Sequence, residues 1–197
     1  MMDLTYLKDR WESDAGRAFV NAVLNPKIAR DEYKAICTQF FKHSDSFIVS
    51  TTTRGNCRLE DLRAIHLSRR DLSDLVFATG DLSFAKLEAC DLDGVSFSAS
   101  NLAHASLKGS YAKSGVDFFE CCAGAASFEA VEFTGANFCN ADLRTANFSN
   151  AVLIRCNLES VQFQGAILDG LTMVDCKVAG LQVDSHQINA AWFRQGR

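Results

Sequence analysis

Large apolar residues recur at every fifth position along most of this chain. In the segment GANFCNADLRTANFSNAVL, residues 135–153, Phe138, Leu143, Phe148 and Leu153 share one phase, and an alanine stands two places before each of them. An amphipathic helix repeats its apolar face about every 3.6 residues, and a half-buried strand repeats it at every second residue. The spacing therefore indicates neither element. It predicts a chain that turns a corner after each short segment.

The same phase extends in both directions and shifts only once. Large apolar residues stand at every fifth position from Leu62 to Leu107, the phase moves by one residue between Ala112 and Phe118, and it then continues to Val183. Asp, Asn and Gly, which favour turns, fall beside the corners. Four corners close a square coil of about 20 residues, and coils stacked at strand spacing, about 4.8 Å, bury the apolar positions between them. Residues 20 apart should then be neighbours, which predicts a ladder of Phe77, Phe97, Phe118 and Phe138.

The pattern A-(D/N)-(L/F)-x-x, as in ANFCNADLRTANFSNAVL, resembles the pentapeptide repeat family over roughly residues 57–183. This resemblance implies an all-β solenoid, a right-handed quadrilateral β-helix of about six to seven coils. We predict three parts. Residues 1–50 form a helical N-terminal cap, residues 51–183 form the β-helix with a phase break near 110–117, and residues 184–197 form a C-terminal helix or cap.

Residues 1–50 lack the repeat and show helical spacing instead. The apolar positions of the first segment are Leu7, Trp11, Ala15, Ala18 and Ala22. This segment should end at Pro26, with Ser13 able to cap a helix that begins beside it and Gly16 allowing another element to approach. A second amphipathic helix is predicted from Tyr33 to Phe41. Two interpretations stay open: a cap over the exposed edge of the first coil, or a partner-binding pair of helices.

The C-terminal residues change character after Val183. Asp184 or Ser185 can cap a short helix that runs through Trp192 and Phe193. This position is similar to the C-terminal segment through which quinolone-resistance pentapeptide proteins, the Qnr and MfpA type, dimerise. The resemblance implies a homodimer contact at Trp192 and Phe193, and the alternative is that these two residues cover the last coil.

The phase break, KGSYAKSGVDFFECCAG, replaces two large inward residues by Ala112 and Ala123. An unfilled core leaves a cavity, which lowers stability. We therefore predict that Tyr111 or Phe119 swings inward to compensate. The inserted residue is interpreted as a tolerated bulge, with a protruding contact as the alternative.

Composition and charge fit an ordinary globular protein. The chain has 197 residues, 48% hydrophobic residues and a net charge of −4. The N-terminus has acidic residues where a signal peptide needs a basic start, and no apolar run is long enough for a membrane span, so a cytoplasmic location is expected. Four of the eight cysteines occupy the small-residue slot of the repeat, namely Cys90, Cys121, Cys156 and Cys176. They are predicted to be structural thiols, with no metal site and no cofactor.

Acidic residues concentrate in the middle of the repeat. Residues 71–142 contain eleven acidic and three basic residues, about one net negative charge per 2 Å of axis, against about 1.7 Å for duplex DNA. Twenty-residue spacing places Asp71, Asp74, Asp91 and Asp93 on one side of the square, and we add Glu132 to this candidate acidic face. The start of the repeat is basic, because it carries Arg54, Arg58, Arg63, Arg69 and Arg70.

No phosphate-binding loop, nucleophile elbow or metal-ligand spacing occurs, so no enzymatic activity is predicted. We predict an interaction module that binds another protein through a face of the β-helix. The alternative, implied by the quinolone-resistance resemblance, is an inhibitor or protector of a type II topoisomerase (DNA gyrase) that acts by mimicking DNA. Neither direct nucleic acid binding nor a membrane partner is expected.

Overall fold

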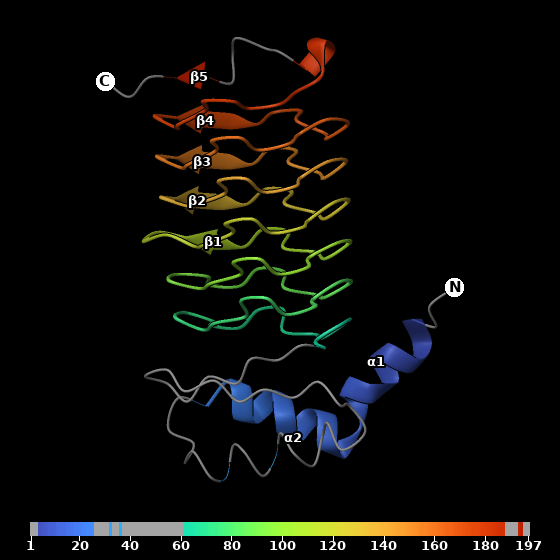
Figure 1. The fold of residues 1–197 in the computed structure, drawn as a ribbon. Coiled ribbons are helices and arrows are strands. Elements are labelled where there is room, and N and C mark those ends of the chain that lie inside the picture. The colour runs from blue at the N-terminus through green and yellow to red at the C-terminus, as the bar shows by residue number, and fades with distance from the viewer. Residues whose placement is uncertain (1–3, 26–31, 33–35, 37–60, 188–192, 195–197) are drawn as a thin grey trace.

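The structure, a computed structural model, describes residues 4–25, 32, 36, 61–187 and 193–194 (Figure 1). Two helices lie at one end of a tower of stacked coils, and residues 193–194, the last described ones, lie at the other end. The predicted repeat residues 51–60 and most of the predicted second helix, Tyr33 to Phe41, lie outside the described residues. Within the described part, no helix is long and apolar enough to cross a membrane.

Each coil takes 20 residues, as the five-residue period predicts. Asp61 pairs in parallel with Asp81, and Asp81 with Asn101. The ladder hydrogen bonds join each coil to the next, as between the Leu62 amide and the Asp81 carbonyl oxygen at 2.8 Å. A residue with positive φ recurs at every fifth position, for example Ala64 at 58° and Arg69 at 61°. These residues make the corners, so the tower is a four-sided parallel β-helix.

Each of the four sides carries one column of outward residues, and the sides are numbered in chain order. The first side runs from Asp61 to Gln182, the second from His66 to Ile167, the third from Asp71 to Thr172 and the fourth from Val76 to Lys177. At the phase break the pairing offset rises to 21 residues, as between Ser96 and Asp117, because one residue is inserted between Ala112 and Asp117. We call residues 61–110 the lower coils and residues 117–184 the upper coils.

Regular strands form on the third side only, within the described part of the chain. They are β1 (Tyr111–Ala112), β2 (Glu132–Thr134), β3 (Val152–Ile154), β4 (Thr172–Val174) and β5 (Phe193–Arg194), and they form one parallel sheet in this order. The outward positions of β3 and β4 are β-branched, which favours extended backbone. In the lower coils the same positions carry Asp71 and Asp91, and the chain makes turns there.

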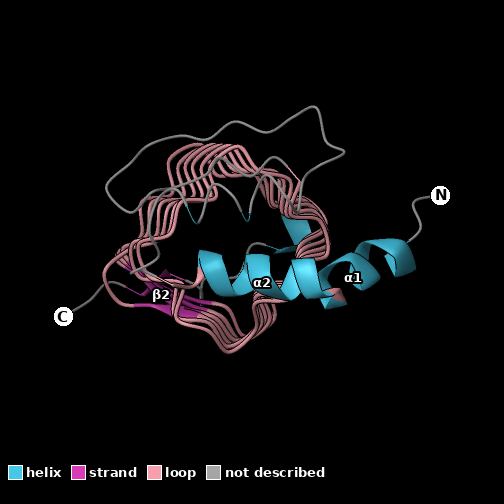
Figure 2. Ribbon diagram, turned by 90° about the horizontal axis from the view of Figure 1, so that it is seen from below, coloured by secondary structure: helices cyan, strands magenta, loops and turns pink. Residues whose placement is uncertain are grey.

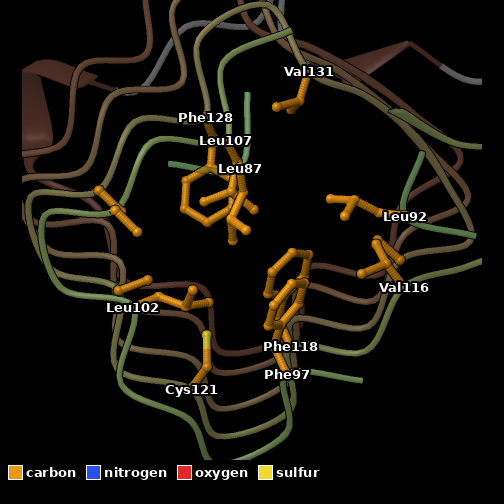
Figure 3. Close-up of a cluster of buried hydrophobic side chains, with 14 of the residues drawn as sticks. Leu87, Leu92, Phe97, Leu102, Leu107, Val116, Phe118, Cys121, Phe128 and Val131 are labelled. Atoms are coloured by element: carbon orange, nitrogen blue, oxygen red, sulfur yellow. The ribbon is translucent and has the colours of Figure 1, made fainter. Parts of the chain in front are cut away.

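The core is a stack of inward side chains in columns. Phe77, Phe97, Phe118 and Phe138 stack face to face, with successive ring centroids 5.4, 5.2 and 4.7 Å apart. Figure 3 shows Phe97 and Phe118 in one column and Leu87, Leu107 and Phe128 in the column on the opposite side of the core. All are buried.

The predicted inward swing of Tyr111 or Phe119 is wrong. Tyr111 is 37% exposed and Phe119 is half-buried on the outer surface. Phe128 and Phe133 of the following coil instead pack against Phe118, with centroids 5.6 and 5.8 Å from it. Phe133 pairs with Ala112, so a large residue one coil above compensates for that alanine.

Two helices cover the lower end, α1 (Leu4–Glu12) and α2 (Asp14–Val23). The predicted cap is confirmed: Ser13 ends the first helical segment and caps α2 by accepting a hydrogen bond from the Gly16 amide at 3.0 Å. A Cβ on Gly16 would lie 2.3 Å from the Arg10 carbonyl oxygen, so only glycine allows the two helices to approach this closely. Figure 2 shows α2 crossing the end of the tower.

Side chains of α1 donate hydrogen bonds to backbone carbonyl groups at the start of the first described coil. Trp11 Nε1 donates to the Arg63 carbonyl oxygen at 2.8 Å, and the Arg10 guanidinium donates to the carbonyl oxygens of Asp61 and Arg63. In the ladder, a carbonyl at this position accepts from the coil beneath it. Side chains of the helix therefore donate to part-buried carbonyl groups at a position where, higher in the tower, backbone amides are the donors.

The upper end differs from the prediction. A helix through Phe193 was expected, but the described residues form a 3₁₀ turn at Ser185–Gln187 and the strand β5, in which Phe193 pairs with Met173. Phe193 lies 20 residues after Met173, so the repeat phase continues and pairing with the open edge of β4 prevails over a helix. Trp192 lies outside the described residues. Asp184 accepts a hydrogen bond from the Gly165 amide at 2.7 Å and so closes the last coil.

Candidate functional site

The third side brings together the acidic residues singled out in the sequence. Asp71, Asp91, Tyr111 and Glu132 follow one another in its outward column. Asp74 and Asp93 lie three and two residues further along their segments, and the Asp74 amide donates to the Asp93 carbonyl oxygen at 2.8 Å. We call Asp71, Asp74, Asp91 and Asp93 the acidic strip. Glu132 is separated from it by the coil of Tyr111.

Local turn chemistry explains why the lower coils carry aspartate. Asp71 Oδ1 accepts from the Ser73 amide at 2.9 Å, and Asp91 Oδ1 accepts from the Asp93 amide at 3.1 Å. These bonds hold the corner in place of a regular strand. Part of the acidic strip therefore serves the fold itself.

The acidic strip also anchors the inserted residue. Asp93 accepts hydrogen bonds from the amides of Lys113 and Ser114, the second at 2.9 Å. Asp91 Oδ2 accepts from the Tyr111 hydroxyl at 3.2 Å. This hydrogen bond, with the neighbouring charges of Asp91, Asp71 and Asp93, raises the pKa of Tyr111. The phase break is thus a bulge tied down by two carboxylates.

Negative charge does not continue along the third side. The Lys113 ammonium lies over the Tyr111 ring, 5.6 Å from its centroid, directly above the acidic strip. Beyond it the exposed and half-buried outward residues of the strands are mostly uncharged. We call this region the strand surface; it consists of Tyr111, Thr134, Val152, Ile154, Thr172 and Val174. A hollow of about 290 Å³ lies on it, lined by Tyr111, Glu132, Val152 and Ile154 among others.

The remaining acidic residues of the 71–142 window are spread around the tower. Asp81 and Asp142 lie on the first side, Glu88 and Glu129 on the second, and Asp117 and Glu120 on the fourth. Three of them form ion pairs: Asp81 with Arg63 at 3.9 Å, Glu129 with Lys108 at 2.8 Å and Asp142 with Arg144 at 2.7 Å. The negative charge counted along the axis is therefore distributed over four sides, and no single side reaches the charge density of duplex DNA.

One charged network lies where the helices meet the first coil. Asp61 accepts from Arg10 at 2.9 Å and from Arg63 at 2.8 Å. Partial burial would raise the pKa of Asp61, but the hydrogen bonds from Arg63 and Arg10 outweigh it and hold that pKa well below its ordinary value. The sequence analysis did not predict this network. The signal available was the adjacent Arg10 and Trp11, an arginine next to a tryptophan in the first helical segment.

The cysteines lie where the repeat predicts. Cys90, Cys121 and Cys156 are buried, and Cys90 Sγ donates to the Leu67 carbonyl oxygen at 3.1 Å. Burial raises the pKa of the Cys90 and Cys121 thiols, which opposes formation of reactive thiolates. Among the described residues, no group of His, Cys, Asp and Glu could hold a metal ion.

Comparison with known proteins agrees with this geometry. The family model described as pentapeptide repeats matches eight copies, over residues 81–112 and 132–170. The fold class predicted from the sequence, the right-handed quadrilateral β-helix of that family, is confirmed. No curated protein sequence matches the chain.

Several solved structures are similar to part of the chain. A trypsin-treated form of QnrB1, a plasmid-mediated fluoroquinolone resistance protein, is 20% identical with a TM-score of 0.49, over 66% of this chain and 77% of that one. A pentapeptide repeat protein from the thylakoid lumen of Arabidopsis thaliana is 26% identical with a TM-score of 0.36, over 53% and 63%. Rfr23, a pentapeptide repeat protein from the cyanobacterium Cyanothece 51142, is 20% identical with a TM-score of 0.36, over 63% and 84%.

Proposed function

Because the coiled part of this chain belongs to the pentapeptide repeat family, we propose that the protein is a non-enzymatic interaction module that binds a protein partner through the strand surface. The observation that carries the proposal is the change along the third side, from the acidic strip to β-branched residues and an exposed tyrosine. The proposed partner presents apolar side chains to the strand surface and basic side chains to the acidic strip.

The strand surface has the properties of a binding site for a protein. Its backbone is held by ladder hydrogen bonds on both sides, so little conformational entropy is lost when a partner binds. Tyrosine is enriched in interfaces, and Tyr111 stands at the edge of the hollow of about 290 Å³. A side chain of the partner placed in this hollow would act as the anchor.

Photo-cross-linking tests the surface directly. We place p-benzoyl-phenylalanine at Tyr111 on the third side or, as a matched aromatic control, at Phe119 on the fourth side. We then irradiate the full-length protein in an extract of its source cells. The proposal predicts one specific adduct from position 111 and none from position 119. An adduct from position 119 alone would contradict the choice of surface.

The spread of acidic residues over four sides supports the interaction module over DNA mimicry. The alternative has its own test, a supercoiling assay with purified DNA gyrase, with and without a quinolone. Inhibition or drug protection that disappears when Asp71, Asp74, Asp91 and Asp93 are changed to Asn would support DNA mimicry. Activity that survives this change but is lost in Ile154→Lys would make the topoisomerase a partner of the strand surface.

Two further predictions accompany the proposal. A homodimer through the C-terminal residues would double the length of the tower, and sedimentation velocity of the protein with and without residues 188–197 tests it. A cytoplasmic location is expected from the sequence, and fractionation of the source cells tests that.

A further inference from the structure

A second hollow, of about 500 Å³, lies at the lower end of the tower between the two helices and the first and second sides. Figures 1 and 2 show the position of α1 and α2 beneath the coils that form its other wall. Its size falls within the range of small-molecule sites, about 300 to 1,000 Å³. The strand surface lies on a different side of the tower, and none of its residues lines this hollow.

The walls of the hollow carry an excess of positive charge. His66 and Lys86 are neighbours in the outward column of the second side, and Arg70 lies at the end of that side. All three are exposed, and Arg70 and Lys86 form no ion pair within the described residues. From the helices come Arg17, which is paired with Asp14, and Glu12, the only acidic residue of the lining. Clustered cations of this kind attract an anion.

An aromatic ring is presented beside these cations. Phe84 stacks on His104 of the next coil, with centroids 4.9 Å apart and planes 9° from parallel. In the coil below, the equivalent residue is Ala64, which contributes only a methyl group. Because the Phe84 ring is parallel to that of His104, its other face is directed towards the level of Ala64 and the hollow. A flat ring bound there would extend the Phe84–His104 stack by one step.

The helical wall completes the set of groups. Val20 adds apolar surface, and the Asn21 amide can both donate and accept hydrogen bonds. The Arg70 guanidinium offers the planar fork that matches a phosphate group. A ring-stacking face, a cationic wall and an amide within one hollow of this size fit a flat heteroaromatic ring that carries phosphate.

We propose that this hollow binds a mononucleotide, with its base stacked on Phe84 and its phosphate against Arg70 and Lys86. The site binds the ligand without chemistry, since no group in it is arranged for catalysis. Such a ligand would contact α2 and the first coils together. Its binding would therefore hold the helices against the tower.

The test uses the full chain with Trp192→Phe, so that Trp11 in the wall of the hollow is the only tryptophan. Adenosine 5′-monophosphate (AMP) is titrated by tryptophan fluorescence and by calorimetry, beside adenosine, ribose 5-phosphate and inorganic phosphate. We expect saturable AMP binding with Kd below about 1 mM, and binding at least about tenfold weaker for each of the three fragments. No saturation by AMP, or equal binding of ribose 5-phosphate, would overturn the proposal.

Variants separate this site from general surface charge. Arg70→Gln and Phe84→Leu should each weaken AMP binding by about tenfold or more. The matched controls Arg144→Gln, on the upper part of the first side, and Phe119→Leu, on the fourth side, should change it less than about twofold. Arg70 is exposed, so its variant should keep the circular dichroism of the parent. Equal losses in variants and controls would overturn the proposal.

Discussion

The lower and upper coils share one five-residue phase but differ both inside and outside. Inside, the lower coils use leucine in three columns and phenylalanine in one, whereas the upper coils add Phe128, Phe133, Phe148 and Phe163. On the third side, the lower coils carry aspartates that cap their own turns, whereas the upper coils carry β-branched residues that form strands. The five-residue phase thus fixes the shape of each coil, whereas the residue types at the inward and outward positions determine how that coil packs and what surface it presents.

The largest effect should come from the core at the boundary between the two regions. Phe118 contacts Phe97, Phe138, Phe128 and Phe133, whereas Phe77 has one ring neighbour, Phe97, among the described residues. Phe118→Ala should lower the free energy of unfolding by about 3–5 kcal/mol, and Phe77→Ala by less, because it leaves a smaller cavity. Urea unfolding followed by circular dichroism measures both. Equal losses would show that the columns pack independently of their ring neighbours.

The lower end should be selectively sensitive to acid. The pKa of Asp61 is lower in the folded state than in the unfolded state, so its contribution is complete above about pH 4 and is lost as the pH falls through the folded pKa. Asp61→Asn should lower stability by about 1–3 kcal/mol at neutral pH and reduce the loss below about pH 4. Thermal unfolding between pH 2 and 7 measures this. The exposed Asp14→Asn is the control, and equal pH profiles for both variants would contradict the role of the network.

The corners should tolerate alanine at a modest cost that depends on their surroundings. Gly94 has φ of +68°, and a Cβ there would lie 2.4 Å from Asp74 Oδ1, whereas Gly109 has φ of +66° with open space around it. Gly109→Ala should lose about 1 kcal/mol from the backbone conformation alone, and Gly94→Ala somewhat more. Adding Asp74→Ala should remove the difference, as measured by urea unfolding. A persistent difference would point to a cause other than the carboxylate.

The smallest effect concerns the hydrogen bond from the Tyr111 hydroxyl, on the strand surface, to Asp91 of the acidic strip. Tyr111→Phe should change stability by less than about 0.5 kcal/mol, since the side chain is exposed. Asp91→Asn should lower the pKa of Tyr111 towards its ordinary value, because the carboxylate raises it in the native protein. NMR titration of ring-labelled tyrosine measures this shift. Ser73→Ala serves as the control, and an unchanged Tyr111 pKa in Asp91→Asn would contradict the contact.

Much of the tower could be predicted from the sequence, because a solenoid repeats one local rule. Inward residues 20 apart become neighbours, which is why Phe97 and Phe118 could be paired across the single inserted residue. The same rule, applied to every acidic residue, would have distributed Asp81, Glu88 and Asp117 among three other sides. The comparison with the charge density of duplex DNA came from counting charge along the axis without assigning it to sides.

The ends could not be predicted as well, since they depend on contacts between parts far apart in the sequence. Nothing local in Arg10 or Trp11 shows that they donate to carbonyl groups of residues 61 and 63. At the other end, Asp184 and Ser185 resemble helix caps locally, but the open edge of β4 recruits Phe193 into β5. The sequence analysis did not predict the strand surface, because it did not group the β-branched residues at outward positions by the side on which they lie.

The most direct test of the proposed interaction measures how tightly the cross-linked partner binds to variants of the two sides. Calorimetry would compare the parent, Ile154→Lys on the strand surface and Asn140→Lys on the fourth side, each checked for an unchanged fold. The account predicts that Ile154→Lys weakens binding by about tenfold or more and that Asn140→Lys leaves it within about twofold. Unchanged affinity in Ile154→Lys, with a loss in Asn140→Lys, would contradict it.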